Sequence, residues 1–292
     1  MLYLRRNTDI HIASALFVKT NNDMKKNYLK NKTMGIIGAG NMGEALISRM
    51  HKDFKLLVTD KRMSRKRYLS TRYQIKLLDN NRRLCEQADI IILAVKPQDM
   101  RNLLIEIKAD ITKRHLIISI AAGIKTGFIE KLLGNNIHVV RVMPNTPALI
   151  GCGVSCFCYG RFATAHDLQA AESILLFLGE AVLLKEKLFD VVTALSGSGP
   201  GFLAYFIECF IQAAKKQGLT EDKAKRLFVK TMHGTARLIE ETRISPRALI
   251  SKAASRGGTT EAGIGILKQY RVNDIINMVI KKATHRAKEL SI

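Results

Sequence analysis

The chain has 292 residues, 47% of them hydrophobic, which is enough to bury a core and suits two domains better than one. Its longest apolar run, at residues 115–124, is broken by Ser119 and Gly123 and falls short of the roughly 18 residues that cross a bilayer. The net charge of +22 is spread over every segment without an aromatic-interleaved patch, which favours a solvated basic surface over a nucleic-acid interface. We therefore expect a soluble protein that binds neither membranes nor nucleic acid.

The first 33 residues differ from the rest of the chain. They are polar and basic, show no sustained period, and are expected to form a disordered N-terminal extension. Arg5 and Arg6 precede a short apolar stretch, as in a secretion signal, but the small residues 13–15 lie inside that stretch instead of following it. We therefore expect no secretion, and Met24 and Met34 are alternative starts.

A strand, a glycine-rich loop, a helix and a second strand follow within about 30 residues, the length of a βαβ unit. The strands are expected at residues 34–37 and 54–58 and the helix at residues 44–50. The loop between them comprises Gly38, Ala39, Gly40, Asn41, Met42 and Gly43. Gly38 permits the tight turn, Gly40 lets the backbone approach a diphosphate, and Gly43 lets the helix pack closely on the strand. The pattern predicts a dinucleotide-binding Rossmann domain, which we place at residues 34–184.

The end of the second strand gives two conflicting signals about the cofactor. Asp60 stands where an acidic residue accepts hydrogen bonds from a ribose 2′-hydroxyl, which favours NADH. Lys61, Arg62 and Arg65 follow at once, and basic groups there hold a 2′-phosphate, which favours NADPH. The sequence leaves both cofactors open, with a slight preference for NADPH.

Three further apolar runs, at residues 88–95, 116–120 and 139–142, predict strands in βα alternation. Ligands bind at the carboxyl ends of such strands, so each end is a candidate wall of the cofactor site. Lys96 follows the first run and either pairs with a phosphate or ribose or lies at the surface. Asn145 follows the third run in a loop stiffened by two prolines, a suitable place for an amide near a nicotinamide.

Residues 185–292 carry amphipathic helical patterns and are expected to form an all-α domain. The predicted helices span residues 202–217, 221–239, 247–253, 261–268 and 273–290. The predicted fold class is therefore α/β, a Rossmann domain with a parallel sheet followed by a helical domain.

A glycine–threonine turn before the fourth of these helices is the second chemical feature. It comprises Ser255, Arg256, Gly257, Gly258, Thr259 and Thr260. The glycines expose N–H groups at a helix N-terminus and the hydroxyls add donors, which together suit a small carboxylate. The alternative is a plain capping turn with Thr259 or Thr260 as N-cap.

Five cysteines occur in a chain that does not need disulfides to fold, so we expect reduced thiols and a cytoplasmic location. Cys152, Cys156 and Cys158 lie close together in a segment typical of a strand, whose alternation places the last two on one face. No histidine or fourth cysteine stands at a matching spacing. The pattern predicts strand packing and no metal site.

Six motifs occur together and in order: GIIGAGNMGEAL at 35–46, AVKP at 94–97, SIAAGI at 119–124, RVMPNTPAL at 141–149, ALSGSGP at 194–200 and GGTTEAG at 257–263. This set resembles the pyrroline-5-carboxylate reductase family from residue 34 to about residue 290, and the last three motifs are the more specific. The resemblance implies reduction of 1-pyrroline-5-carboxylate to proline, the last step of proline biosynthesis, with NADPH or NADH. It also implies that the helical domain forms a homodimer or higher oligomer.

The resemblance also assigns roles to individual residues. Thr260 would hydrogen-bond the substrate's ring nitrogen as the catalytic side chain, and the turn would hold its carboxylate through Ser255, Gly257, Gly258 and Thr259. Asn145 would lie near the nicotinamide. The residues lining the cofactor would include Ala94, Val95, Lys96, Pro97 and Ala121.

The sequence departs from the family pattern most clearly at Arg256, where the family usually has proline before the two glycines. An arginine there either strengthens carboxylate binding or disturbs the turn. Two alternatives therefore stay open. One is a β-hydroxyacid dehydrogenase of similar build, which would need Lys215 or Lys216 as its acid/base, and the other is a paralogue that binds cofactor without turnover.

Overall fold

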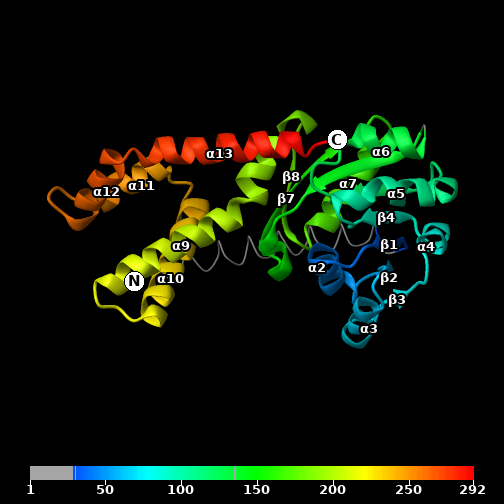
Figure 1. Ribbon diagram of the computed structural model, residues 1–292, viewed down its shortest axis with the longest axis horizontal. Coiled ribbons are helices and arrows are strands. Elements are labelled where there is room, and N and C mark those ends of the chain that lie inside the picture. Colours follow the sequence, from blue (N-terminus) through cyan, green and yellow to red (C-terminus); the bar gives the residue numbers. More distant parts are fainter. Residues whose placement is uncertain (1–28, 30, 135) are drawn as a thin grey trace, which may run out of the picture. The chain divides into compact units, whose positions relative to one another are not determined.

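A computed structural model describes residue 29, residues 31–134 and residues 136–292 of the chain (Figure 1). Most of the extension predicted at residues 1–33 lies outside the described residues. The chain divides into two compact units, the first ending at Gly197 but also containing Arg286–Ile292, and the second formed by Ser198–His285. The functional boundary predicted between residues 184 and 185 stays a prediction.

The first unit is built on one sheet of eight strands in the order β3-β2-β1-β4-β5-β6-β7-β8. The strands are β1 (Thr33–Ile37), β2 (Lys55–Thr59), β3 (Lys76–Leu77), β4 (Ile90–Leu93), β5 (Leu116–Ser119), β6 (His138–Met143), β7 (Gly153–Tyr159) and β8 (Gly179–Leu183). All neighbours pair in parallel except β6 and β7, which are antiparallel. Only residues 144–152 join those two strands, too few for the crossover that a parallel pair needs. The predicted α/β class is thus confirmed, with a sheet that is mostly parallel.

Helices cover both faces of this sheet (Figure 1). The helices of this unit are α2 (Asn41–Met50), α3 (Met63–Arg72), α4 (Asn81–Gln87), α5 (Pro97–Ile107), α6 (Thr126–Leu133), α7 (Ala165–Leu175) and the short α8 (Phe189–Val192), of which α2 to α7 contribute to the cores against the sheet. The short turns are the 3₁₀ segments η1 (Lys108–Asp110), η2 (Thr146–Ile150) and η3 (Glu186–Leu188) and the π-helical segment η4 (Thr193–Gly197). Alternate residues of each strand enter opposite cores, as Ile92 and Ile91 do in β4. One core takes α2, α3 and α7, and the other takes α4, α5 and α6.

His115 is a buried histidine that the fold keeps neutral. Its ring accepts a hydrogen bond from the Thr112 N–H at Nδ1 (2.9 Å), and Nε2 lies 3.0 Å from the Cys85 carbonyl oxygen. Burial, together with the charge of Arg114, lowers the pKa of His115 below its ordinary value, although the two backbone contacts and Asp89 act in the opposite direction. The unfolded chain therefore binds this proton more readily than the folded one.

We expect the free energy of unfolding to fall as the pH drops below the unfolded histidine pKa of about 6.5, and this contribution to be constant at higher pH. The reason is that His115 must stay neutral in the fold but takes up a proton when the chain unfolds. Denaturant titrations at pH values from about 5 to about 8, the range in which histidine usually titrates, would measure how the free energy of unfolding depends on pH. His115→Gln, which keeps a donor for the Cys85 carbonyl, should show a shallower decline; equal slopes would contradict the assignment.

The second unit is all-helical, as predicted. Its helices are α9 (Gly199–Lys216), α10 (Glu221–Thr242), α11 (Pro246–Ala253), α12 (Thr259–Gln269) and α13 (Val272–Glu289), whose last residues belong to the first unit. Helices α9 and α10 form an antiparallel pair in which the rings of Phe210 and Phe228 stack with their centroids 4.1 Å apart. Gly218 ends α9 with a positive φ of 95°, which accounts for the tight connection.

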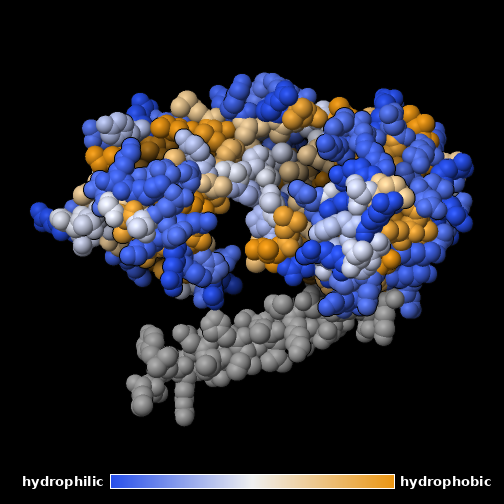
Figure 2. Space-filling view, turned by 60° about the horizontal axis from the view of Figure 1, so that its bottom comes forward, coloured by the Kyte–Doolittle hydropathy of each residue, from blue (hydrophilic) through white to orange (hydrophobic). Residues whose placement is uncertain are grey.

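Large apolar side chains of this unit are exposed in the single chain, and Figure 2 shows hydrophobic residues at the molecular surface. They include Leu203, Tyr205, Leu227, Ile266, Tyr270 and Met278. The helical stretch Glu186–Lys216 is even long and apolar enough, by composition alone, to cross a membrane, with 11% of its most apolar window buried. The sequence estimate missed this stretch because it counted only unbroken apolar runs. Exposed apolar area of this extent marks a surface that another protein or a membrane covers.

Candidate functional site

The loop between β1 and α2 contains three glycines, and the surroundings of each glycine in the structure differ. A Cβ on Gly38 would stand 2.8 Å from the Ala94 carbonyl oxygen, and its φ of 93° also favours glycine. A Cβ on Gly43 would stand 2.3 Å from the Gly38 carbonyl oxygen, so helix and turn could not pack. A Cβ on Gly40 would meet nothing within 4 Å, and Gly40 has an ordinary φ of −65°. Packing therefore requires Gly38 and Gly43, whereas none of the described residues packs where a side chain of residue 40 would stand.

A pocket of about 750 Å³ opens over this loop. Nine of the predicted cofactor residues line it: Gly38, Gly40, Asn41, Met42, Asp60, Lys61, Ala94, Val95 and Lys96. Lys96 is exposed and stands directly before α5, whose first residue is Pro97. The predicted strand ends after β1, β2 and β4 thus meet at one pocket.

Five other predicted cofactor residues lie outside the wall of this pocket: Ala39, Gly43, Pro97, Ala121 and Asn145. Ala39 and Ala121 are buried. Asn145 is also buried, and its Oδ1 accepts a hydrogen bond from the Val154 N–H at 3.0 Å, which ties the loop after β6 to β7. Their roles at the cofactor stay predictions.

Sequence reasoning missed a polar wall of the pocket that is contributed by α4 and α5. Gln98, Asn102 and Glu106 line the pocket at a spacing of four residues along α5. Glu106 accepts a hydrogen bond from Asn81 Nδ2 at 3.1 Å, and Asn81 Oδ1 accepts one from the Thr59 hydroxyl at 2.7 Å. Side chains four residues apart share a helix face, so the i, i+4, i+8 pattern after Lys96 was the available signal.

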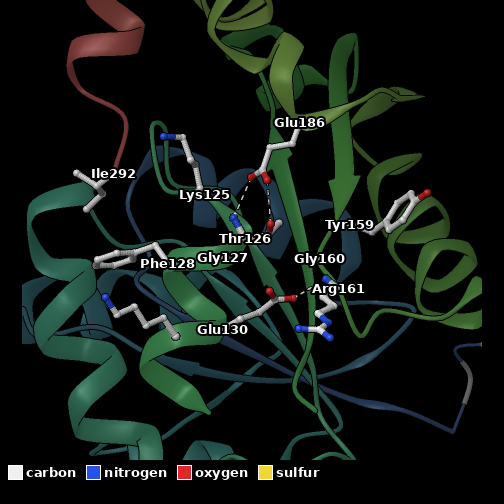
Figure 3. A pocket seen from close by; sticks show the side chains of 11 residues that line it. Lys125, Thr126, Gly127, Phe128, Glu130, Tyr159, Gly160, Arg161, Glu186 and Ile292 are labelled. Atoms are coloured by element: carbon white, nitrogen blue, oxygen red, sulfur yellow. Dashed lines mark hydrogen bonds between the residues drawn. The ribbon is translucent and has the colours of Figure 1, made fainter. Parts of the chain in front are cut away.

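A second pocket of about 720 Å³ lies beside α6 and the end of β7 (Figure 3), and none of the predicted site residues line it. Its Glu186 carboxylate accepts hydrogen bonds from the N–H and hydroxyl of Thr126, both at 2.9 Å, and from buried Arg141 at 3.1 Å. Glu130 accepts the Arg161 N–H at 2.6 Å. Both carboxylates are thus engaged in holding the wall together, with Glu186 satisfying the start of α6.

Of the three clustered cysteines, Cys156 and Cys158 are buried in β7, whereas Cys152 is exposed. Burial raises the pKa of Cys158 to about 12, and it also raises the pKa of Cys156. Protonated, buried thiols suit the predicted strand packing. Within the described part of the chain, no three side chains of the metal-ligating types come together.

The glycine–threonine turn of the second unit begins α12. Gly258 is the N-cap, so neither threonine has the capping role that the alternative interpretation gave it. Thr259 and Thr260 are exposed in the first turn, where backbone N–H groups lack helical acceptors. Gly257 has a φ of 69°, and its N–H donates to Glu261 Oε2 at 2.7 Å. The Gly258 N–H also donates within the turn, to the Ser255 carbonyl oxygen at 2.9 Å, so both glycine N–H groups that were expected to be exposed are engaged. The donors left for a small anion are the N–H groups and hydroxyls of Thr259 and Thr260.

Comparison with known proteins covers both units. A family model for pyrroline-5-carboxylate reductase dimerisation matches residues 186–290, and one described as NADP oxidoreductase, coenzyme F420-dependent, matches residues 33–123. Pyrroline-5-carboxylate reductase of Aquifex aeolicus is 34% identical over 88% of this chain and 97% of its own length. Pyrroline-5-carboxylate reductase 1 of Bacillus subtilis is 35% identical over 89% of this chain and 90% of its own.

Solved structures give the same answer. The pyrroline-5-carboxylate reductase of Coxiella burnetii has a TM-score of 0.84 at 31% identity, covering 89% of this chain and 99% of that one. The Plasmodium falciparum pyrroline carboxylate reductase, solved with NADP bound, has a TM-score of 0.81 at 28% identity, covering 90% of this chain and 99% of that one. Because residues 186–290 match a dimerisation region, the chain self-associates. Its sequence and its fold place this chain in the pyrroline-5-carboxylate reductase family.

Proposed function

We propose that this chain reduces 1-pyrroline-5-carboxylate to proline with NADPH or NADH as donor, the last step of proline biosynthesis. The observation that carries the proposal is the sequence identity of 34–35% to pyrroline-5-carboxylate reductases over 88–89% of this chain. In the reaction, a hydride adds to the C=N carbon, a proton completes the ring N–H, and the oxidised cofactor leaves. A protonated imine is already electrophilic, so the enzyme's main task is to hold two reactants in the correct orientation.

The cofactor fits the pocket over the glycine loop. Gly40 has open space where a side chain would stand, which suits the close approach of a diphosphate to the backbone. The N-terminus of α2 supplies N–H groups and a favourable dipole at that point. Bound NADPH or NADH supplies the hydride. The residues proposed to form the cofactor site, either by touching the cofactor or by holding its contacts in place, are Gly38, Ala39, Gly40, Asn41, Met42, Gly43, Asp60, Lys61, Ala94, Val95, Lys96, Pro97, Ala121 and Asn145.

The substrate carboxylate is assigned to the turn before α12, with Ser255, Gly257, Gly258 and Thr259 as its contacts. Free N–H groups in the first turn of that helix support this role, because they attract an anion. Thr260 is proposed to hydrogen-bond the ring nitrogen and hold the C=N bond in position. The exposure of both threonine side chains leaves their hydroxyls free for such contacts.

Self-association is proposed to give a homodimer or a higher oligomer. The exposed apolar side chains of α9, α10, α12 and α13 support a protein–protein surface, since a single chain leaves them in water. The location is proposed to be the cytoplasm, in keeping with five cysteines that form no disulfide.

The test is oxidation of NADPH and of NADH by the purified full chain, with and without 1-pyrroline-5-carboxylate, and with proline identified as the product. Substrate-dependent oxidation with either cofactor supports the proposal. Cofactor binding without any oxidation would instead show a paralogue that has lost turnover. Oxidation of NADPH or NADH that occurs only when a β-keto acid is added would favour the β-hydroxyacid dehydrogenase alternative.

Arg256 allows a separate prediction about substrate affinity. Its side chain is exposed in the turn, where it is free to reach a bound carboxylate. If it grips the substrate, Arg256→Pro should raise the Michaelis constant about tenfold, the loss of one charge-assisted hydrogen bond at a solvated site. Steady-state kinetics with Arg256→Gln as the matched variant measure this. An unchanged or lower Michaelis constant in both variants would show that the arginine has no such role.

A further inference from the structure

The end of β2 carries one carboxylate and three cations close together, namely Asp60, Lys61, Arg62 and Arg65. From the sequence alone they favour opposite cofactors. The contacts that each side chain makes in the structure show which of these four groups can bind a ligand and which are already engaged within the protein.

Asp60 is fully engaged by the protein. Its Oδ2 accepts hydrogen bonds from the Ala39 N–H (2.9 Å) and from Arg62 Nη2 (3.2 Å). Its Oδ1 accepts from the Arg62 N–H (2.9 Å) and from Arg62 Nε (3.0 Å). An ionised carboxylate offers about four acceptor sites, and all four are occupied. A ribose hydroxyl would therefore have to displace a donor.

Asp60 also stays ionised in this setting. Burial would raise the pKa of its carboxyl, but the hydrogen bonds from Arg62 and from the Ala39 N–H outweigh burial and lower the pKa below its ordinary value. A charged carboxylate fixed on the glycine loop and on Arg62 joins β2, the loop and the start of α3. These contacts indicate that Asp60 has a structural role within the protein and does not bind the ligand.

The three cations differ in the same way. Arg65 is only 20% exposed, donates from Nε to the Ala39 carbonyl oxygen at 2.5 Å, pairs with Glu44, and does not line the pocket. Lys61 lines the pocket and is 79% exposed, but its ammonium pairs with Asp99 at 3.2 Å and is a point charge without the planar fork that grips a phosphate through two parallel bonds. Arg62 lines the pocket, is 54% exposed, and uses only Nε and Nη2 towards Asp60. Within the described residues, its Nη1 makes no hydrogen bond.

The total charge of the wall does not decide the matter, because its charged groups balance. They are Lys61, Arg62, Lys96, Asp60, Asp99 and Glu106. Position decides instead. Arg62 stands directly before α3, whose first turn contains no acidic residue, so no carboxylate of that turn competes for the guanidinium or repels an anion bound to it. That position suits a phosphate, which a guanidinium can bind through two parallel hydrogen bonds.

We propose that Arg62 recognises the 2′-phosphate of NADPH, and that Asp60 is a positioning residue that holds Arg62 and the glycine loop instead of binding the ribose. This inference rests on the proposed function for the identity of the cofactor. It makes NADPH the preferred donor, and it assigns the selectivity to one side chain.

The experiment measures equilibrium binding to the full chain by calorimetry, with adenosine 2′,5′-bisphosphate and 5′-AMP as probes. Arg62→Gln should raise the Kd for the bisphosphate about tenfold and leave the Kd for 5′-AMP within about twofold. Arg67→Gln is the matched control, because Arg67 is an exposed cation of α3 that does not line the pocket. That control should change neither Kd by more than about twofold. Equal bisphosphate affinity in wild type and Arg62→Gln would overturn the proposal.

Asp60→Asn tests the second half of the proposal. Asparagine can still accept the Ala39 N–H, so the loop keeps its anchor, and the Kd for NAD⁺ should stay within about twofold of wild type. A tenfold or larger loss of NAD⁺ affinity would show that Asp60 binds the ribose and would overturn this part. These binding results are separate from the reductase assay. A chain that binds the bisphosphate through Arg62 but oxidises no NADPH refutes only the proposed function.

Discussion

Replacing Gly40 with alanine is expected to weaken NADPH binding about ten- to a hundredfold while the fold stays intact. The added methyl meets no protein atom within 4 Å, and the backbone at Gly40 is one that alanine adopts readily. Among the described residues nothing stands in its way, so the partner that we expect it to meet is the cofactor diphosphate. Forcing a methyl into a closely packed contact costs about 1–3 kcal/mol, which corresponds to that range of Kd. Calorimetric titration with NADPH measures the effect.

Two further glycine variants give this experiment its controls. Gly43→Ala should destabilise the apo-protein, since its Cβ would stand 2.3 Å from the Gly38 carbonyl oxygen. Gly127→Ala lies on an exposed helical position with open space, and it should leave both stability and binding close to wild type or slightly raise stability. If Gly40→Ala binds NADPH as tightly as Gly127→Ala, the diphosphate does not approach the loop where we place it.

The glycine loop could be predicted from sequence because its requirements are local. The turn between β1 and α2 needs glycine at Gly38 and Gly43, and at Gly43 the reason lies within a few residues, because a Cβ there would meet the Gly38 carbonyl oxygen. At Gly38 the close contact is with Ala94, which directly follows the neighbouring strand β4. The apolar strands around β1, β2, β4, β5 and β6 and the helices of the second unit were equally readable, since hydrophobic patterns record them directly, whereas the order of the strands in the sheet was not predicted. The strand β7 was foreseen at the clustered cysteines, but its antiparallel direction was not, although the short connection after β6 contains the reason.

Which of the charged residues after β2 face the pocket, and which are engaged within the protein, could not be predicted from sequence. Arg62 and Arg65 are alike in type and only three residues apart, yet Arg62 lines the pocket and Arg65 does not. What separates them is Glu44, which lies on a different helix and forms an ion pair with Arg65. Only the packing of α2 against α3 brings these side chains together. The same holds for Asn81 and Glu106, whose hydrogen bond joins two helices.

The turn before α12 illustrates a different limit. Its residues could be selected from sequence because two glycines and two threonines at a helix start suggest an anion, but a capping turn would look the same. Gly258 as N-cap removes the capping explanation for Thr259 and Thr260. The remaining assignment, which gives Thr260 a role in the reaction, is open to a direct experiment.

Replacing Thr260 with alanine is expected to lower kcat about ten- to a hundredfold while the Kd for NADPH stays unchanged. One hydrogen bond to a charged group contributes about 1.5–3 kcal/mol, and here the group is the iminium nitrogen whose position sets the reaction geometry. The cofactor pocket belongs to the first unit and does not include Thr260, so its affinity has no reason to change. Single-turnover and steady-state kinetics separate the two quantities.

Loss of structure cannot explain such a result. Thr260 is exposed in the first turn of α12, and alanine is the better helix former there, so the free energy of unfolding should be equal or slightly higher. Thr260→Ser keeps the hydroxyl and should retain most of the activity, whereas Thr260→Val keeps the shape without the hydroxyl and should resemble the alanine variant. If valine retains full turnover, the hydroxyl takes no part in the reaction, and the backbone N–H groups of the turn must orient the substrate unaided.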